Sequence, residues 1–200
     1  MRRISSICVY CGSGLGRDPD YALAADRLGA ILAAAGVRLV YGGGSVGLMG
    51  RVAHATLSAG GAVTGVIPQF LRDREVMLEE VDDLLVTRDM HERKRLMFER
   101  SDAFVALPGG IGTLEEVVEM MTWAQLGQHD KPIALLDVNG FWAPLVELIG
   151  HMQAEAFIRE GFEVPFEVVD RLDDLLPRLE AAAARAAGRR VENAAVLGRM

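Results

Sequence analysis

The segment from Pro108 to Glu116 combines glycines, a hydroxyl group and two carboxylates, and reads Pro-Gly-Gly-Ile-Gly-Thr-Leu-Glu-Glu. Glycines let a phosphate approach the backbone N–H groups, to which the Thr113 hydroxyl can add a hydrogen bond. Glu116 would then direct a carboxylate at the atom beside a phosphate-bearing sugar. The structural alternative is a helix-capping box formed by Thr113 and Glu116. A capping box requires neither Pro108 nor three glycines, so the spacing favours a phosphate site with a reactive carboxylate.

A second group of charged residues lies upstream, in the segment Asp-Met-His-Glu-Arg-Lys-Arg that ends at Arg95. The spacing that follows is helical, which places these basic residues near the start of a helix. Cations there oppose the helix macrodipole, and a bound anion would explain their presence. A solvated charged face balanced by Glu92 and Glu99 explains the same spacing. The sequence leaves both explanations open.

Two further glycine-rich segments, residues 11–16 and 42–50, each follow an apolar run. The second contains G-x-G-x-x-G, but no acidic residue near Ile67 could bind the ribose of a dinucleotide. It also lacks the lysine of a triphosphate-binding loop, because Leu48 takes that place. A dinucleotide cofactor and a nucleoside triphosphatase are therefore disfavoured. The residues that we expect to contribute to a phosphate-binding loop are Gly43, Gly44, Ser45 and Gly109.

The cysteines and lysines argue against metal and cofactor chemistry. Cys8 and Cys11 form a C-x-x-C pair, but Cys8 lies inside an apolar run and the four histidines lack ligand spacing. We therefore expect buried, inert thiols and no metal site. A pyridoxal enzyme needs a Schiff-base lysine, and the chain offers only Lys94 and Lys131. We expect no cofactor, because Lys94 belongs to the candidate anion cluster and Lys131 precedes a proline.

Short β-rich runs alternate along the chain with segments of helical spacing. The expected strands are residues 6–10, 37–41, 62–67, 83–87, 103–107, 133–137 and, more weakly, 166–169. The expected helices are residues 21–35, 47–59, 90–101, 114–126, 141–160 and 172–187. This alternation, with apolar strands, predicts a doubly wound α/β fold in which helices cover both faces of a parallel sheet. The three glycine-rich segments then meet at the carboxyl edge of the sheet, where helix N-termini attract anions.

Composition bounds the class of protein. The chain has 200 residues, a formal charge of −7 and a mean hydropathy of +0.20, which fits a folded domain and disfavours nucleic-acid or anionic-membrane partners. The longest uncharged stretch, residues 52–71, contains glycines and a proline, so we expect no transmembrane helix. The first residues lack the pattern of a secretion signal, and we expect a cytoplasmic protein.

One domain is expected over residues 1–180, followed by a flexible tail over 181–200. Large apolar residues give way to Ala and Arg after Ala181. We therefore expect the chain to fray and to leave the core near Gly188.

Four phrases together resemble the Lonely Guy family, the cytokinin riboside 5′-monophosphate phosphoribohydrolases. They are Gly-Gly-Gly-Ser-Val-Gly-Leu-Met-Gly, Met-His-Glu-Arg-Lys, Pro-Gly-Gly-Ile-Gly-Thr-Leu-Glu-Glu and Thr-Trp-Ala-Gln-Leu, which begin at residues 42, 90, 108 and 122. The resemblance covers about residues 7–162. It implies a Rossmann-like fold, a homodimer with its sites near the subunit interface, and an N-glycosidase. This hydrolase would cleave N6-modified adenosine 5′-monophosphates to free base and ribose 5-phosphate.

The same resemblance implies site residues by matching positions. Arg93 and Glu116 take the catalytic positions. The substrate contacts are Glu75, Arg93, Lys94, Gly110, Ile111, Gly112, Thr113, Leu114, Glu115, Glu116 and Thr122. Related proteins labelled as lysine decarboxylases or resembling molybdenum-cofactor carriers leave a non-catalytic nucleotide-binding or cofactor-carrying protein as the alternative.

The helices around Arg93 and Thr122 carry more apolar residues than one buried face needs, which favours a subunit contact there. These residues are Met97, Phe98, Met120, Met121, Trp123 and Leu126. A pocket for an N6 substituent could use Met90, Met97, Met120, Met121 or Trp123, although such residues are more often core. Plain AMP therefore remains a possible substrate.

Overall fold

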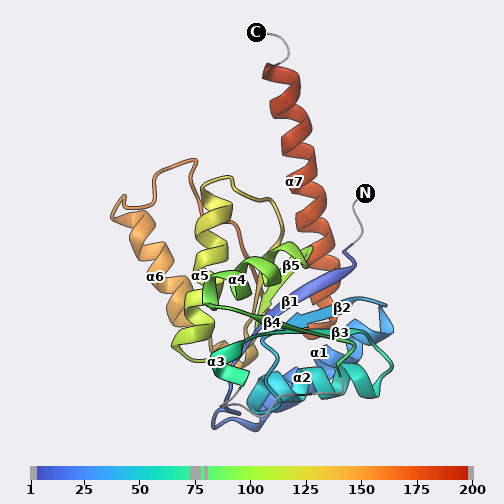
Figure 1. Ribbon diagram of the computed structural model, residues 1–200. Coiled ribbons are helices and arrows are strands. Elements are labelled where there is room, and N and C mark those ends of the chain that lie inside the picture. Colours follow the sequence, from blue (N-terminus) through green and yellow to red (C-terminus); the bar gives the residue numbers. More distant parts are fainter. Residues whose placement is uncertain (1–3, 73–77, 79–80, 198–200) are drawn as a thin grey trace.

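The computed structural model describes residues 4–72, 78 and 81–197, with side chains as far as residue 187. Seven parallel strands form one sheet in the order β4-β3-β2-β1-β5-β6-β7 (Figure 1). The strands are β1 (Ser6–Tyr10), β2 (Arg38–Tyr41), β3 (Val63–Pro68), β4 (Asp83–Thr87), β5 (Ala103–Ala106), β6 (Ile133–Leu136) and β7 (Glu167–Val169). All seven expected strands are present, with ends that differ by one residue at most.

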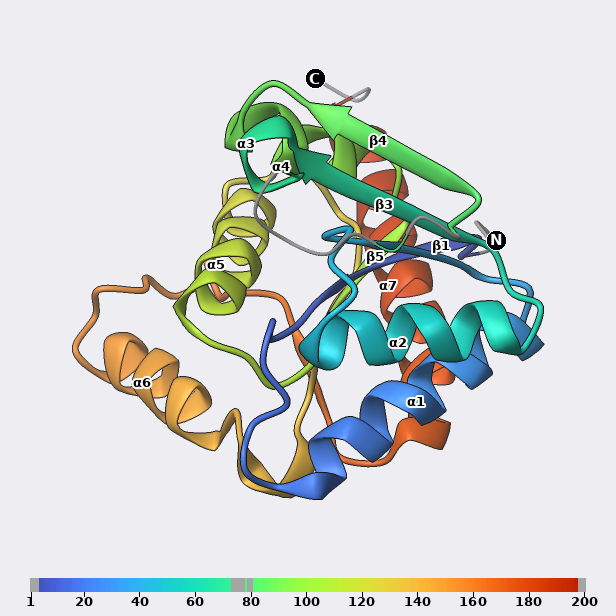
Figure 2. The same ribbon diagram turned by 60° about the horizontal axis from the view of Figure 1, so that its bottom comes forward.

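Helices cover both faces of this sheet (Figure 2). They are α1 (Pro19–Ala34), α2 (Gly47–Ser58), α3 (Gln69–Arg72), α4 (Met90–Glu99), α5 (Ile111–Gln125), α6 (Ala143–Ala154) and α7 (Leu175–Leu197). Helices α1, α2 and α7 pack on one core, and α4, α5 and α6 pack on the other. The predicted doubly wound α/β fold is confirmed.

Strand β1 shows why the sequence folds into two layers of helices around a sheet. Ile7 and Val9 belong to the core under α1 and α2, whereas Cys8 and Tyr10 belong to the core under α4 and α5. All four side chains are at most 2% exposed. Successive side chains of a strand point to opposite faces, so a strand covered on both faces must be apolar throughout.

Strands β1 and β5 are neighbours, but the chain leaves them in opposite directions. From β1 the chain passes through α1 to β2, and from β5 it passes through α5 to β6. Such a reversal opens a crevice between the two loops at the carboxyl edge, where ligands of doubly wound folds bind. The loop of residues 11–16 and the loop that begins at Pro108 flank this crevice.

Several helix boundaries differ from the sequence predictions. Helix α5 begins at Ile111, three residues earlier than expected, and α6 ends at Ala154, six residues earlier than expected. Ala156 follows α6 with a positive φ of 59°, a left-handed conformation that a regular helix does not allow. The four-residue helix α3 was not expected, because so short an element has no periodicity to detect.

Helix α7 extends well beyond the rest of the domain (Figure 1). The backbone expected to fray near Gly188 is helical as far as Leu197, and Ala186 is only 8% exposed. The flexibility expected over residues 181–200 stays a prediction. Within the described residues, no helix is long and apolar enough to cross a membrane.

Candidate functional site

A cavity of about 270 Å³ occupies the crevice between β1 and β5. It is lined by residues 12–16 and 108–110, together with Tyr21, Leu48 and Phe141. The loops hold one another directly, since the Gly12 N–H donates to the Pro108 carbonyl at 3.0 Å and the Leu48 N–H donates to the Gly12 carbonyl at 3.0 Å. The three glycine-rich loops therefore meet at one edge of the sheet, as the sequence predicted.

The glycines of the loop after β2 are required by close packing. A Cβ on Gly47 would lie 2.2 Å from the Ser13 carbonyl carbon, and Gly47 has a φ of +62°. A Cβ on Gly42 would lie 2.3 Å from Nη2 of Arg93. Gly43 and Gly44, predicted to contact phosphate, are buried here. Gly47 joins the loops and Gly42 makes room for Arg93, and a phosphate contact at Gly43 and Gly44 stays a prediction.

The glycines at the start of α5 face open space. A Cβ on Gly110 or Gly112 would meet no atom within 4 Å, and both residues are exposed. Gly110 is the N-cap of α5 and supplies no side-chain cap, so the helix start presents free N–H groups and the positive end of the dipole. Thr113 follows in the first turn and is 5% exposed. This backbone is suited to bind a phosphate.

The capping-box alternative at Thr113 is excluded by where α5 begins. Because the N-cap is Gly110, Thr113 is the third residue of the helix and cannot cap it. The Thr113 hydroxyl instead packs against Gly109, where an added Cβ would lie 2.2 Å from Oγ1. Gly109 therefore serves the packing of Thr113, and Glu116 is not needed as a capping partner.

Arg93 and Glu116 lie side by side where α4 meets α5. Nη1 of Arg93 is 3.9 Å from Oε1 of Glu116, and these side chains are 11% and 13% exposed. Two backbone carbonyls hold the Arg93 side chain in place. Its Nε donates to the Val66 carbonyl at 3.2 Å, and its Nη2 donates to the Gly42 carbonyl at 3.5 Å. The planar guanidinium is thus fixed by one carbonyl within β3 and one just after β2, and it presents one edge to a carboxylate.

Burial dominates the electrostatics of Glu116 and raises the pKa of its carboxyl group above the ordinary value of 4.5. Arg93 opposes this effect and lowers the pKa. A carboxylate with a raised pKa beside a fixed cation, one turn into a helix whose start is open, is typical of a group that exchanges protons.

Lys94, which the sequence suggested for an anion cluster, pairs with two carboxylates of α5. Its Nζ donates to Oε1 of Glu115 at 2.7 Å and to Oε1 of Glu119 at 3.0 Å. Burial alone lowers the pKa of Lys94, but these two hydrogen bonds outweigh it and the net pKa is raised. Arg93 and Lys94 are therefore balanced by α5, whereas Arg95 pairs with Glu99 of its own helix at 3.8 Å.

Helix α5 carries three further predicted contacts, Thr122, Ile111 and Leu114. Thr122 is exposed on α5, and its hydroxyl donates to the Val118 carbonyl of its own helix at 2.8 Å. Glu75 lies outside the described residues. Ile111 is 82% exposed at the helix start, and Leu114 packs against the core beside α5.

Sequence reasoning missed Glu119 and the side chains that line the crevice. Glu119 follows Glu115 by four residues, so helical spacing alone could have placed both on the Lys94 side of α5. Tyr21 and Phe141, whose rings meet edge to face at 5.7 Å, come from segments that no local pattern connects.

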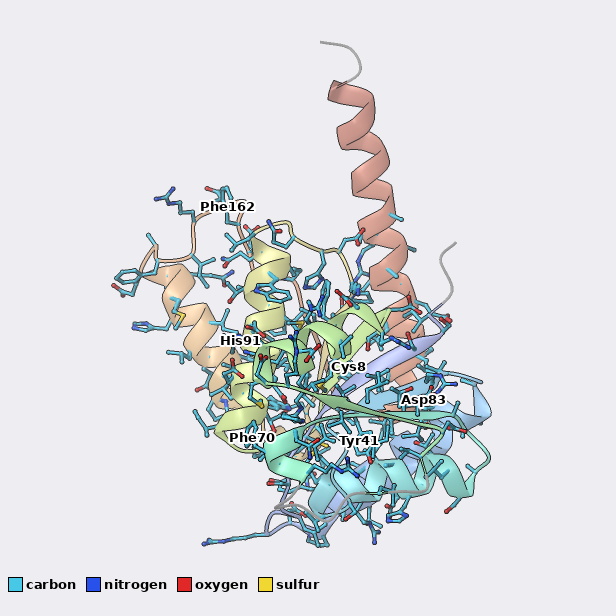
Figure 3. The ribbon with its side chains drawn as sticks, in the orientation of Figure 1. Cys8, Tyr41, Phe70, Asp83, His91 and Phe162 are labelled. Atoms are coloured by element: carbon cyan, nitrogen blue, oxygen red, sulfur yellow. The ribbon has the colours of Figure 1, made fainter. Side chains whose placement is uncertain are left out.

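The cysteines are free, and both are buried as predicted. Burial raises the pKa of each thiol, so neither is ionised near neutral pH. Figure 3 shows Cys8 inside the sheet and His91 on α4. In the described part of the chain, no group of three or more His, Cys, Asp or Glu side chains could hold a metal ion.

A larger cavity of about 520 Å³ lies at the opposite, amino edge of the sheet. Its polar side chains are engaged within the protein. Nε2 of His129 lies 2.9 Å from the Met120 carbonyl, Lys131 donates to the Phe98 carbonyl at 2.6 Å, and Arg185 pairs with Glu167 at 2.5 Å. Helix N-termini and the glycine-rich loops are at the other edge, so we assign the site to the start of α5, which borders the smaller crevice at Gly110; Arg93 and Glu116 lie outside the lining of that crevice.

The residues predicted to form a subunit contact mostly pack inside the chain. Met97, Met120 and Met121 are at most 2% exposed, and Phe98 and Trp123 pack against the same core. This part of the prediction is wrong, because the long side chains fill the space between α4, α5 and the sheet. Leu126 alone of the six is exposed, at 66%.

Comparisons with known proteins show which proteins this chain resembles. A family model described as "Possible lysine decarboxylase" matches residues 49–179. A cytokinin riboside 5′-monophosphate phosphoribohydrolase of Oryza sativa subsp. japonica, LOG, is 48% identical over 185 residues, which cover 89% of this chain and 76% of that protein. Its relative LOG1 from Arabidopsis thaliana is 45% identical over 190 residues, which cover 92% and 89%.

Solved structures share the fold at lower identity. The molybdenum cofactor carrier protein of Chlamydomonas reinhardtii has a TM-score of 0.68 and 22% identity, over 92% of this chain and 99% of that one. The molybdenum cofactor binding protein of Rippkaea orientalis has a TM-score of 0.66 and 24% identity, over 90% and 98%. At this identity the likeness shows the fold alone.

Proposed function

The chain belongs to the Lonely Guy family, and on that premise we propose that it hydrolyses cytokinin riboside 5′-monophosphates. The relatives LOG and LOG1 are named for that activity, and each matches most of this chain. The reaction breaks the C1′–N9 bond of an N6-modified adenosine monophosphate. Water supplies a hydroxyl group to C1′ and a proton to the base, so the products are ribose 5-phosphate and the free base.

In this proposal the phosphate binds at the start of α5. The N–H groups of the first turn, at Gly112 and Thr113, point at the anion, and Gly110 leaves space for it. Phosphate binding there fixes the sugar beside Glu116, one turn further along the helix. Binding energy from this remote group orients the bond to be broken.

Glu116 then acts on the sugar. As a carboxylate it stabilises the oxocarbenium-like charge on C1′ and accepts a proton from the attacking water. Arg93 acts through its charge and its fixed position. The observation that carries this proposal is the 3.9 Å separation of Arg93 and Glu116 in a buried setting beside an open helix start.

The family description as a lysine decarboxylase does not suit the chemistry of this chain. Pyridoxal chemistry needs a lysine that is free to form a Schiff base. Lys94 is bound to two carboxylates, and Lys131 donates to the Phe98 carbonyl while its Nζ lies 3.8 Å from the centre of the Phe98 ring. Neither lysine of the sequence is placed to carry the cofactor.

A nucleotide-binding or cofactor-carrying protein is the second candidate function, since structures with those titles share the fold. A product assay with N6-isopentenyl-AMP, AMP and the matching nucleosides decides between them. We expect release of free base and ribose 5-phosphate from a monophosphate and poor turnover of the nucleosides. Tight binding without any product would favour the carrier. Equal turnover with and without phosphate would contradict the phosphate site.

We also propose a homodimer with the site near the subunit interface. Exposed apolar side chains lie on α5 and directly after it, and on α6 and after it, and Leu126 is the one among them that was first expected; they are Ile111, Val118, Leu126, Leu148, Met152, Phe157 and Phe162. Figure 3 shows Phe162 at the outer end of the loop that follows α6. Apolar surface of this extent favours a protein partner. A fully active monomer in sedimentation at micromolar concentration would overturn this proposal.

We place the enzyme in the cytoplasm. Two free cysteines three residues apart, Cys8 and Cys11, suit a reducing compartment. Fractionation of cells that produce the tagged protein tests this location.

A further inference from the structure

Glu119, on α5, is bound at one carboxylate oxygen and free at the other. Its Oε1 accepts a hydrogen bond from Lys94 at 3.0 Å. Its Oε2 is buried and has no hydrogen-bond partner among the described residues. A buried carboxylate oxygen without a hydrogen-bond donor lowers the stability of the folded state, which suggests that Glu119 has a function. The site proposed above gives Glu119 no role.

The position of Glu119 connects it to the reactive pair. It lies three residues after Glu116, so the two carboxylates project from adjacent turns of α5. Lys94 directly follows Arg93 on α4. The contacts of Arg93 with Glu116 at 3.9 Å and of Lys94 with Glu119 at 3.0 Å therefore join α4 to α5 side by side. A third contact, of Lys94 with Glu115, is shorter at 2.7 Å.

The two contacts differ in how firmly they are made. Arg93 and Glu116 are too far apart for a hydrogen bond, whereas Lys94 and Glu119 are within hydrogen-bond distance and 14% and 24% exposed. Glu115, the other partner of Lys94, is 54% exposed and therefore better screened by solvent. Glu119 is thus the stronger of the two anchors for Lys94.

We propose that Glu119 is a positioning residue for this reaction, which anchors Lys94 so that α4 keeps Arg93 beside Glu116, and whose charge acts on Glu116. This inference rests on the proposed function. This role explains the free oxygen of Glu119, because a carboxylate that is only partly neutralised keeps a negative field on Glu116. Full pairing of Glu119 would remove that field.

The charges that face Glu116 determine whether loss of the Glu119 charge raises or lowers the pKa of Glu116. Those that act on its pKa after burial are Arg93, Glu115, Lys94 and Glu119, of which the two cations lower the pKa and the two carboxylates raise it. The nearby groups of β1 and its loop, Cys8, Tyr10 and Cys11, have raised pKa values and stay neutral. Removing the Glu119 charge also leaves Lys94 less compensated. Both changes lower the pKa of Glu116.

The test is the pH profile of kcat/KM for a nucleoside monophosphate. In Glu119→Gln the acidic limb is expected to move to lower pH by roughly half a unit, since a charge a few ångströms away in a partly solvated site has that effect. KM stays within about twofold because Glu119 is not placed against substrate, and kcat falls several-fold. A residue with a merely structural role would change the melting temperature and leave the limb in place.

Two variants control for charge and for unrelated surface change. Glu119→Asp keeps the charge but shortens the side chain, so its limb stays near that of the unmodified enzyme while kcat falls. Glu99→Gln removes a carboxylate that pairs with exposed Arg95, and neither kcat nor the limb should change. A limb that moves equally in Glu99→Gln would overturn the inference.

Lys94→Gln gives the opposite sign and keeps the test decisive if Glu119→Gln does not fold. Loss of this cation raises the pKa of Glu116, so the limb moves to higher pH. An unmoved limb in Glu119→Gln, or in Lys94→Gln where only that variant folds, overturns the role of Glu119. Absence of hydrolysis by the unmodified enzyme would contradict the proposed function instead.

Discussion

The loop after β2 and the loop after β5 are both rich in glycine, but they use it in opposite ways. In the first loop, an added Cβ at Gly47 or Gly50 would collide with backbone atoms at 2.2 Å or 1.9 Å. In the second, Gly110 and Gly112 have nothing within 4 Å of that position. One loop is a packed support, and the other is an open edge that leads into Glu116.

This difference teaches that a glycine-rich motif has to be divided by what surrounds each glycine. The packed loop fits Arg93 through Gly42 and ties β1 to α2, so its glycines serve structure. The open loop exposes the N-terminus of α5, so Gly110 and Gly112 can serve a ligand, whereas Gly109 packs against Thr113. Mutations in the two regions should therefore damage different properties.

The largest expected effect lies on the open side. Glu116→Gln keeps the size of the side chain but removes its charge, and turnover should fall by roughly a hundred- to ten-thousand-fold. The melting temperature at pH 7 should not fall. A carboxyl group whose pKa is raised by burial destabilises the folded state once it is ionised, and Gln removes that penalty. Steady-state kinetics and thermal unfolding of the same preparation measure both properties.

Glu115→Gln is the matched comparison, because it neutralises the preceding residue of the same helix. Glu115 is 54% exposed and points to Lys94, so its loss should lower turnover far less than Glu116→Gln does. An inactive Glu115→Gln beside an active Glu116→Gln would place the reactive carboxylate one residue earlier. A Glu116→Gln variant that unfolds early but keeps its turnover per folded molecule would show a structural residue.

The next largest effect lies on the packed side. Gly47→Ala forces a positive φ on alanine and a backbone collision, which should destabilise the fold by about 3 kcal/mol or more. Gly110→Ala has an allowed conformation, with φ −90° and ψ −161°, and open space, so its stability should change by less than about 1 kcal/mol. Urea unfolding measures both variants.

Kinetics of the same pair sharpen the comparison. Gly110→Ala should raise KM for the monophosphate, because a methyl group beside the helix start obstructs the phosphate. Folded Gly47→Ala molecules should keep KM close to that of the unmodified protein. The reverse pattern, with KM raised only by Gly47→Ala, would move the phosphate to the loop after β2.

The smallest expected effect is a shift in pH dependence across the two regions. Glu116 works as a carboxylate, so activity should fall as the pH drops through its raised pKa. Arg93, which the packed loop supports, lowers that pKa. Arg93→Gln should move the acidic limb of kcat/KM to higher pH by roughly one unit, and Arg93→Lys should restore most of the shift. An unmoved limb in Arg93→Gln would show that Arg93 does not act on Glu116.

Much of the fold could be predicted because its signals are local. Strand β1 is apolar at each of its last four positions, and the segment after β5 carries its glycines and Glu116 at fixed spacing. Helix boundaries were harder to predict. Helix α5 begins at Ile111 because Gly110 caps it through its backbone, whereas the sequence offered Thr113 as a more conventional start.

The site was predicted in its residue types but not in its contacts. Glu116 was indicated by motif spacing and Arg93 by the family resemblance, and the structure brings the two side chains to 3.9 Å. The pairing of Lys94 with Glu119 was not predicted, because side chains on two helices can be matched only when the helices are already packed. The long apolar side chains of α4 and α5 were assigned to a subunit contact for the same reason.

By itself the sequence determined the alternation of strands and helices, the three glycine-rich loops and the order of the reactive residues, since periodicity and turn chemistry act over a few neighbouring residues. Only the tertiary structure decided which glycines are packed and which are open. It also decided that Arg93 is anchored by carbonyls 27 and 51 residues away, at Val66 and Gly42. Burial and charge pairing depend on residues that are distant in the chain, and folding alone brings them together.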